Sequence, residues 1–268
     1  MSNPLFVKTS GFKIIQNING AKSMRSDAKA FGKFNKYFSF LISDEIVAFS
    51  CLLELDRVKL AMKIICPLCS NKAEKFYADT QNYFRCQNCE GIFVDKADLI
   101  STQKEKKVYE QHNIDTDDKG YRKFVSPITN AVLKDFTTTS KGLDFGAGCS
   151  CIIGAVLNEK KYTIHNYDPL FCNDETLLSQ KYDFISSCEV VEHFYKPYKE
   201  FKLLKSMLQE GGKIYIMTEL YDESAFSSWY YKNDPTHVFF YTQKTFQWIK
   251  KEFGFKSLSI EKRLVILN

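Results

Sequence analysis

A short apolar segment that runs into a glycine-rich turn constrains the fold of this chain most strongly. Leu143 to Phe145 reads as a strand, Gly146 and Gly148 follow in the turn, and a helical pattern begins at about Cys151. Glycines at these positions let the backbone approach a ligand closely, and the N-terminus of the following helix offers backbone N–H groups to it. The pattern predicts a strand–turn–helix unit that binds a cofactor.

Acidic residues accompany this turn. Asp144 precedes the glycines, and a second strand ends in Tyr167-Asp168 about 20 residues later, where an acid can accept hydrogen bonds from two ribose hydroxyls. A dinucleotide-binding turn needs G-x-G-x-x-G, but residue 151 is Cys instead of the third glycine. The turn therefore argues against a nicotinamide-dependent oxidoreductase. It favours a cofactor with a cationic amino-acid part and no phosphates.

The rest of the C-terminal half alternates between strand and helix patterns. Strands are expected at 143–145, 162–167, 182–187 and 214–218, helices at 151–158, 198–208 and 244–253, and two further strands within 256–267. Upstream, 101–112 reads as a charged helix, and Ser126-Pro127 has the form of an N-cap followed by proline at the first helical position. Such alternation predicts an α/β fold with a parallel sheet and helices on both faces.

On these motifs, residues 124–268 resemble the class I S-adenosylmethionine (SAM) methyltransferases. The matching segments are Asp144-x-Gly146-x-Gly148, Asp168, Tyr182 to Glu189, and Leu208 to Ile216 with its Gly211-Gly212 pair. The resemblance implies a Rossmann-like sheet and SAM as cofactor, with Asp144 and the turn near the methionine part and Asp168 on the ribose. The full set of expected cofactor-binding residues is Asp144, Gly146, Gly148, Asp168, Cys188 and Glu189. Only 14 residues separate Asp168 from Asp183, so the strand and helix that usually lie there are expected to be trimmed.

Two CxxC pairs form a second motif. Cys66-Pro67-Leu68-Cys69 and Cys86-Gln87-Asn88-Cys89 stand 16 residues apart, and two such knuckles supply the four sulfurs of a tetrahedral zinc site. Free cysteines or a redox pair are the alternatives, but two pairs at this spacing favour a structural Zn²⁺. The remaining five of the 9 cysteines are scattered. This usage argues against a disulfide scaffold and for a reducing cytoplasm.

A further cluster of metal-ligating residue types follows the third expected strand. Glu189, Glu192 and His193 lie where the carboxyl edge of the sheet opens on the ligand crevice, and His237 comes later, in a loop rich in aromatic residues. Two carboxylates and two imidazoles suit Mg²⁺, Mn²⁺ or Zn²⁺. The arrangement resembles the ubiquinone-biosynthesis O-methyltransferases and the small-RNA 2′-O-methyltransferases, in which a metal is thought to hold the acceptor oxygen. In the competing interpretation there is no metal, and His193 is a base or a structural hydrogen bonder.

These motifs divide the chain into an extension at 1–61 of unknown role and expected to be dispensable, a zinc ribbon at 62–100, a helical linker at 101–140 and a methyltransferase domain at 141–268. The net charge is +5, but most of the surplus lies within residues 1–61, so no concentrated basic face indicates nucleic acid. No apolar run reaches the roughly 20 residues of a membrane span. The expected function is methyl transfer to a hydroxyl of a small molecule. An RNA acceptor, or a non-catalytic ribbon module on a methyltransferase scaffold, are the alternatives, and the sequence gives no oligomeric state.

Overall fold

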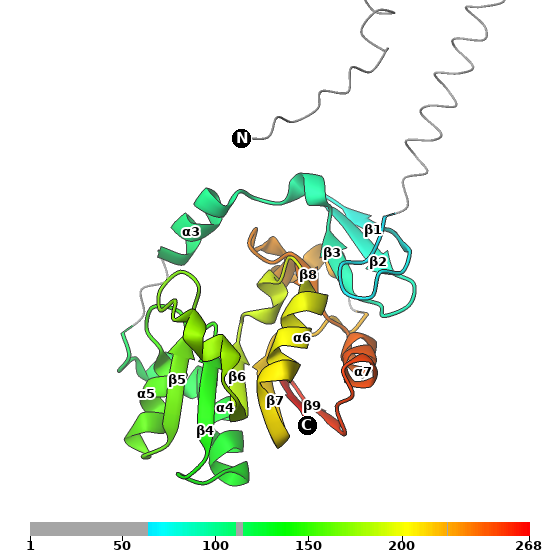
Figure 1. The fold of residues 1–268 in the computed structure, drawn as a ribbon. Helices are drawn as coiled ribbons and strands as arrows, with labels where there is room; N and C mark the ends of the chain where they lie inside the picture. Colours follow the sequence, from blue (N-terminus) through cyan, green and yellow to red (C-terminus); the bar gives the residue numbers. More distant parts are fainter. Residues whose placement is uncertain (1–63, 111–114, 224) are drawn as a thin grey trace, which may run out of the picture. The chain divides into compact units, whose positions relative to one another are not determined.

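The computed structural model describes residues 64–110, 115–223 and 225–268. One compact unit begins at Lys63 and runs to the C-terminus, and Figure 1 shows its helices and strands. The extension expected at residues 1–61 lies outside the described residues.

The larger sheet has six strands in the order β5-β4-β6-β7-β10-β9. The four strands β5, β4, β6 and β7 are parallel, whereas β10 runs antiparallel to both β7 and β9. Their bounds are β4 Lys141–Phe145, β5 Thr163–Tyr167, β6 Tyr182–Cys188, β7 Leu208–Met217, β9 Leu258–Glu261 and β10 Leu264–Leu267. The predicted Rossmann-like α/β sheet is confirmed.

Helices cover both faces of this sheet because the strand residues alternate between two cores. In β6, Phe184 packs with the cluster under α4 (Lys119–Asp135) and α5 (Ile152–Glu159). The next residue, Ile185, joins the opposite cluster with α6 (Pro197–Met207) and α7 (Gln243–Glu252). Successive side chains of a strand point to opposite faces, so one buried strand supplies both cores.

Helix α4 begins earlier than the sequence predicts. Asp118 caps it by accepting a hydrogen bond from the Tyr121 amide at 2.6 Å, and Pro127 lies inside the helix. Proline has no N–H to give to the carbonyl four residues back, and here the Ser126 hydroxyl donates to that Lys123 carbonyl at 2.7 Å. The prediction that the helix starts at Ser126-Pro127 is wrong, because the hydroxyl acts as an internal substitute donor and not as an N-cap.

The connection between Asp168 and Asp183 is short, as expected. It contains one 3₁₀ turn, η2 (Glu175–Ser179), and β5 is the edge strand of the sheet. No further strand of the described chain therefore pairs with the outer side of β5.

The second sheet is antiparallel, with the order β1-β2-β3-β8. β1 (Ala73–Ala78), β2 (Asn82–Cys86) and β3 (Ile92–Val94) belong to the ribbon, but β8 is Phe239–Phe240 from the C-terminal half. In Figure 1, β8 lies beside β3. The sequence does not predict this pairing, which ties residues 62–100 to the loop that carries His237.

The connection from the ribbon to α4 contains the 3₁₀ turn η1 (Lys96–Asp98) and α3 (Thr102–Glu110). The expected end of this helix near His112 lies outside the described residues. In the part of the chain that the structure describes, no helix is long and apolar enough to cross a membrane.

Candidate active site

The glycine turn follows β4 and needs both of its glycines. Gly146 has φ +79° and Gly148 has φ +63°, a backbone region that residues with a Cβ rarely adopt. A Cβ on Gly146 would lie 2.4 Å from Cγ2 of Val190, whereas one on Gly148 would meet nothing within 4 Å. The first glycine therefore permits close packing against the segment after β6, and the second leaves its backbone open to a ligand.

Two acids flank the turn as predicted. Asp144 is buried, its Oδ1 accepts a hydrogen bond from the Ser186 hydroxyl at 2.8 Å, and burial raises its pKa to about 7, with a smaller contribution from the charge of Asp168. Asp168 accepts from the Gly148 amide at 3.1 Å and from the Leu170 amide at 2.8 Å. A carboxylate has about four acceptor positions, so Asp168 retains capacity for a ligand.

One cavity joins the turn to the acidic and histidine residues after β6. Its volume is about 1130 Å³, large enough for a cofactor and a small acceptor together. The residues expected to bind the cofactor all line it: Asp144, Gly146, Gly148, Asp168, Cys188 and Glu189. His193 and His237 line it too. Residues predicted to bind the cofactor and residues predicted to hold the acceptor therefore line one cavity.

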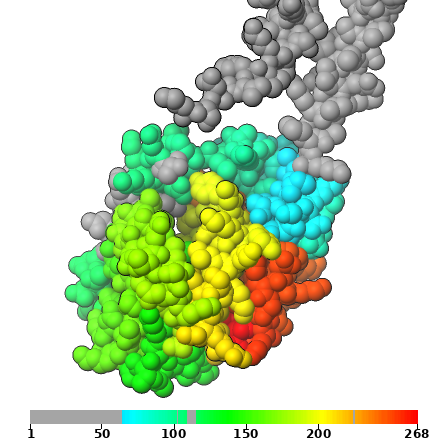
Figure 2. Space-filling model, viewed as in Figure 1, coloured from blue at the N-terminus to red at the C-terminus, as the bar shows by residue number. Residues whose placement is uncertain are grey.

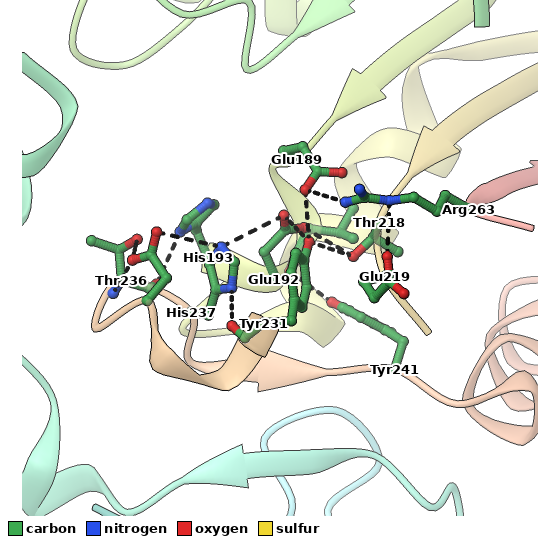
Figure 3. Close-up of polar contacts among 12 residues, drawn as sticks. Glu189, Glu192, His193, Thr218, Glu219, Tyr231, Thr236, His237, Tyr241 and Arg263 are labelled. Carbon is green, nitrogen blue, oxygen red and sulfur yellow. Dashed lines mark hydrogen bonds and ion pairs between the residues drawn. The ribbon is translucent and has the colours of Figure 1, made fainter. Parts of the chain in front are cut away.

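Glu192, His193 and His237 converge at one end of this cavity. One ligand atom from each lies within 4.8 Å of the others, and Figure 3 shows the two imidazoles on one side of Glu192. The 3₁₀ turn η3 (Val191–His193) places Glu192 and His193, while His237 follows the 3₁₀ turn η5 (Tyr230–Asn233). Asp234 Oδ2 lies 3.8 Å from His237 Nε2 at the same place.

Backbone carbonyls fix both imidazoles. Nδ1 of His193 lies 2.9 Å from the Thr236 carbonyl, and Nδ1 of His237 lies 2.7 Å from the Tyr231 carbonyl. A carbonyl oxygen only accepts, so each Nδ1 carries the hydrogen and each Nε2 carries a lone pair, as in metal-bound histidines. Burial lowers the pKa of His193, and burial with the neighbouring His193 lowers that of His237 to about 4. Both rings are therefore neutral at pH 7.

Glu192 is fully buried, and its two oxygens have different partners. Thr218 donates its hydroxyl to Oε2 at 3.1 Å, and the Tyr231 hydroxyl donates to Oε1. Burial raises the pKa of the carboxyl group. His237 Nε2 lies 4.0 Å from Oε1, a separation that a small inward movement would bring within reach of one cation.

Glu189 does not join this group, although the sequence predicts it there. Arg263 holds its Oε2 at 2.6 Å, and the Tyr231 hydroxyl lies 3.1 Å away. Figure 3 shows Glu189 turned towards Arg263, which also contacts Glu219 at 3.1 Å. Glu189 has φ +53°, a strained backbone conformation, and its carboxylate shares the Tyr231 hydroxyl with Glu192 without joining the group of three.

The four predicted zinc ligands come together in the ribbon. Cys66 Sγ lies 3.6 Å from Cys89 Sγ, Cys69 Sγ lies 3.2 Å from Cys86 Sγ, and all four sulfurs lie within 4.8 Å of one another. Sulfurs around tetrahedral zinc are about 3.8 Å apart, because each Zn–S bond is about 2.3 Å. Ser70 and Glu90, which follow the two knuckles, both have φ +58°. The two halves thus repeat one turn geometry, and the donor set fits zinc.

Comparison with known families gives one match, which covers most of the larger sheet. A family model described as a methyltransferase domain matches residues 118–260, more than half of the chain. The chain belongs to the methyltransferase domain family. This family assignment agrees with the fold expected from the sequence. A search of the curated proteins gave no match.

Several solved structures are similar to this chain at low sequence identity. Human N-acetylserotonin methyltransferase in complex with SAM has a TM-score of 0.42 and 11% identity, over 55% of this chain and 53% of that chain. An O-methyltransferase family protein from Burkholderia thailandensis has a TM-score of 0.43 and 12% identity, over 55% of each chain. The methyltransferase spans about half the length of these structures.

Several residues at the site are not predicted from the sequence. Tyr231 contacts both glutamates, Thr218 fixes Glu192, and Arg263 reaches Glu189 from the turn between β9 and β10. Arg263 is the only arginine after residue 122, which is the one feature that sets it apart in the sequence. Its partner lies 74 positions earlier, and no local pattern indicates such a pair.

Proposed function

We propose that this methyltransferase transfers the SAM methyl group to a hydroxyl oxygen of a small molecule bound beside Glu192, His193 and His237. One observation carries the proposal: the two histidines of this cluster and the glycine turn line the same cavity, and Glu192 is buried directly beside those histidines. The turn with Asp144 and Asp168 would hold the cofactor, and the cluster would receive the acceptor. Transfer then requires the oxygen and the sulfonium methyl to be held in line, which is chiefly a matter of positioning.

The cluster also has the donor set of a divalent cation site. Two neutral imidazoles present Nε2 atoms, and a carboxylate lies beside them, a combination that suits Mn²⁺, Mg²⁺ or Zn²⁺. A cation there would lower the pKa of the acceptor hydroxyl. Thr218 and Tyr231 hold the Glu192 carboxylate in place for it. Without a cation, Nε2 of His193 would instead take the proton of the acceptor.

The lining of the cavity supports a small acceptor. Phe124, Phe194, Tyr230 and Tyr231 contribute apolar ring surface to its walls, as is usual for pockets that enclose small ligands. Ring surface of this kind excludes water from the reacting atoms. In the ribbon, Cys66, Cys69, Cys86 and Cys89 would hold one structural Zn²⁺, because a site with four protein ligands leaves no position for a substrate.

Methyl transfer from labelled SAM to fractions of a cell extract tests this function. The purified protein would be assayed with and without added Mn²⁺, and with and without ribonuclease. We expect labelling that depends on Mn²⁺ and survives ribonuclease. Label that ribonuclease removes would identify an RNA acceptor instead, and full labelling without a cation at the cluster would leave His193 as the base.

The zinc needs a separate control, because a strong chelator would remove both metals. A mild chelator is therefore used, and zinc content is measured in the same samples. We expect about one zinc per chain to persist while labelling is lost. A folded preparation without zinc, with all four cysteine thiols open to titration, would contradict the ribbon assignment.

A further inference from the structure

We infer that the ribbon is a positioning element of the acceptor half of the site, acting through the loop at residues 229–241, here called the acceptor loop. The inference rests on the proposed function, because it concerns the part of the cavity assigned there to the acceptor. No ribbon residue that the structure describes, 64–100, is among those that line the cavity. Its influence must therefore pass through the acceptor loop, which carries Tyr231 and His237.

The backbone of Val238 connects the ribbon directly to the cluster. The Val94 amide donates to the Val238 carbonyl at 3.0 Å, and the Val238 amide donates to the Glu192 carbonyl at 2.9 Å. The pairing continues through β3 and β8, with Ile92 opposite Phe240. One residue next to His237 is thus bonded to the ribbon on one side and to Glu192 on the other.

Side chains of the ribbon hold the other end of the acceptor loop. Asp79 forms an ion pair with Lys232 at 2.5 Å, and the Lys232 side chain is only 6% exposed. The Tyr83 hydroxyl donates to the Lys232 carbonyl at 3.3 Å. Lys232 directly follows Tyr231, whose carbonyl fixes the His237 ring. Both ends of the segment between Tyr231 and Val238 are therefore held by the ribbon.

A shared apolar core reinforces these polar contacts. Tyr83, Ile92 and Val94 of the ribbon pack in one cluster with Tyr231 and Phe240. Gly91 lies so close to Phe239 that an added Cβ would stand 2.3 Å from the ring. Figure 2 shows the cyan atoms of the ribbon directly against the orange atoms of the C-terminal segment, where Lys244 of α7 pairs with Glu90 at 2.5 Å.

The two halves of the cavity therefore depend on the ribbon to different degrees. The glycine turn lies on β4 and is fixed by β5 and by Val190, none of which belongs to the ribbon. The acceptor loop is fixed by the ribbon at both ends. In addition, the edge of β3 is already paired with β8, so this edge is not available to a partner chain. The ribbon therefore supports the site of its own chain.

Hydrogen exchange in the full-length Asp79→Asn variant tests this inference. The matched control is Glu74→Gln, which removes an exposed carboxylate of the same ribbon whose only ion pair among the described residues is with Lys72. In Asp79→Asn we expect peptides covering 229–241 to exchange at least tenfold faster, while peptides covering 143–150 are unchanged. Zinc content and SAM affinity should match the wild type, and Mn²⁺ affinity should fall about tenfold. Glu74→Gln should change none of these quantities.

Equal exchange at 229–241 in the two variants would overturn the inference. In Asp79→Asn, an acceleration at 143–150 as large as that at 229–241 would also overturn it, because it would indicate general destabilisation. If Asp79→Asn does not fold, Tyr83→Phe removes only the hydroxyl that reaches Lys232 and is judged by the same criteria. Failure of the wild type to bind Mn²⁺ would contradict the proposed cation and not this inference, because the exchange comparison needs no cation at the cluster.

Discussion

Asp144 is a buried carboxyl group on the strand that leads into the glycine turn. Burial raises its pKa to about 7, so the proposed binding of SAM should be sensitive to pH. At pH 6 the free enzyme holds this group mostly protonated. A cationic amino group bound nearby favours the carboxylate, so SAM binding should release a proton at pH 6. Calorimetry in two buffers with different ionisation enthalpies measures this release. Equal heats in both buffers would contradict the role of Asp144.

The Asp144→Asn variant gives a second measurement on the same residue. Burial raises the pKa in the folded state above the ordinary value of 3.8, so the stability that Asp144 contributes is fully present below pH 3.8 and is lost as the pH rises through about 7. Asparagine cannot ionise. Without SAM, the melting temperature of the variant relative to wild type should therefore rise between pH 5.5 and 8. A constant difference would show that Asp144 does not titrate in this range.

The cluster residues and Glu189 should respond differently to substitution. Glu192→Gln and His237→Ala each remove a donor from the group of three, so we expect Mn²⁺ affinity to fall at least tenfold. Glu189→Gln should lower it less than threefold, because Arg263 and Tyr231 hold this side chain apart. Titration with Mn²⁺ measures the affinities, and SAM affinity serves as the control. An equal loss in Glu189→Gln would restore the four-ligand site expected from the sequence.

Helix α4 contains an interior proline. Pro127 is exposed, and the Lys123 carbonyl depends on the Ser126 hydroxyl. Pro127→Ala restores the backbone donor and should raise the free energy of unfolding by about 1–3 kcal/mol. Urea unfolding measures the gain. Ser126→Ala alone should lower the free energy of unfolding, but it should have almost no effect in the Pro127→Ala background. Equal effects in both backgrounds would contradict this explanation.

Elements formed by local patterns were predictable, and those formed by distant contacts were not. The sequence located β4, β6, α6 and α7 because alternating or helical apolar patterns occur within each segment. It missed β8, since two residues carry no periodicity and their partner β3 lies far away in sequence. It misplaced the start of α4, because Ser126-Pro127 has the same local form inside this helix as at an N-terminus.

The candidate site divides in the same way. The turn glycines, the four cysteines and the converging Glu192, His193 and His237 were found from spacing. The separation of Glu189 from these three residues could not be predicted from spacing. It accompanies a positive φ at Glu189 and an ion pair with Arg263, which lies between β9 and β10. Spacing within one segment predicts which residues are candidates for a site. Contacts between distant segments determine which of their side chains come together.

For the whole molecule, the compact unit that begins at Lys63 suggests a minimal active chain. A chain that begins at Met62 should keep its zinc, its melting temperature and its SAM affinity, because the ribbon and the methyltransferase sheet are both inside it. A chain that begins at residue 101 should lose Mn²⁺ binding, since it lacks the ribbon. Calorimetry and metal analysis compare the three lengths. Strong destabilisation of the Met62 form would show that the first 61 residues belong to the folded unit.

Anomalous diffraction from crystals grown with Mn²⁺ and S-adenosylhomocysteine tests whether the cluster binds a cation in the cavity that holds the cofactor. Data collected at the manganese and zinc edges distinguish the two metals. We expect a manganese peak bonded to Nε2 of His193, Nε2 of His237 and a carboxylate oxygen of Glu192, with the cofactor between Asp144 and Asp168, and a zinc peak among the four cysteines. A cluster without a manganese peak, in crystals that do show the cofactor and the zinc, would contradict this expectation.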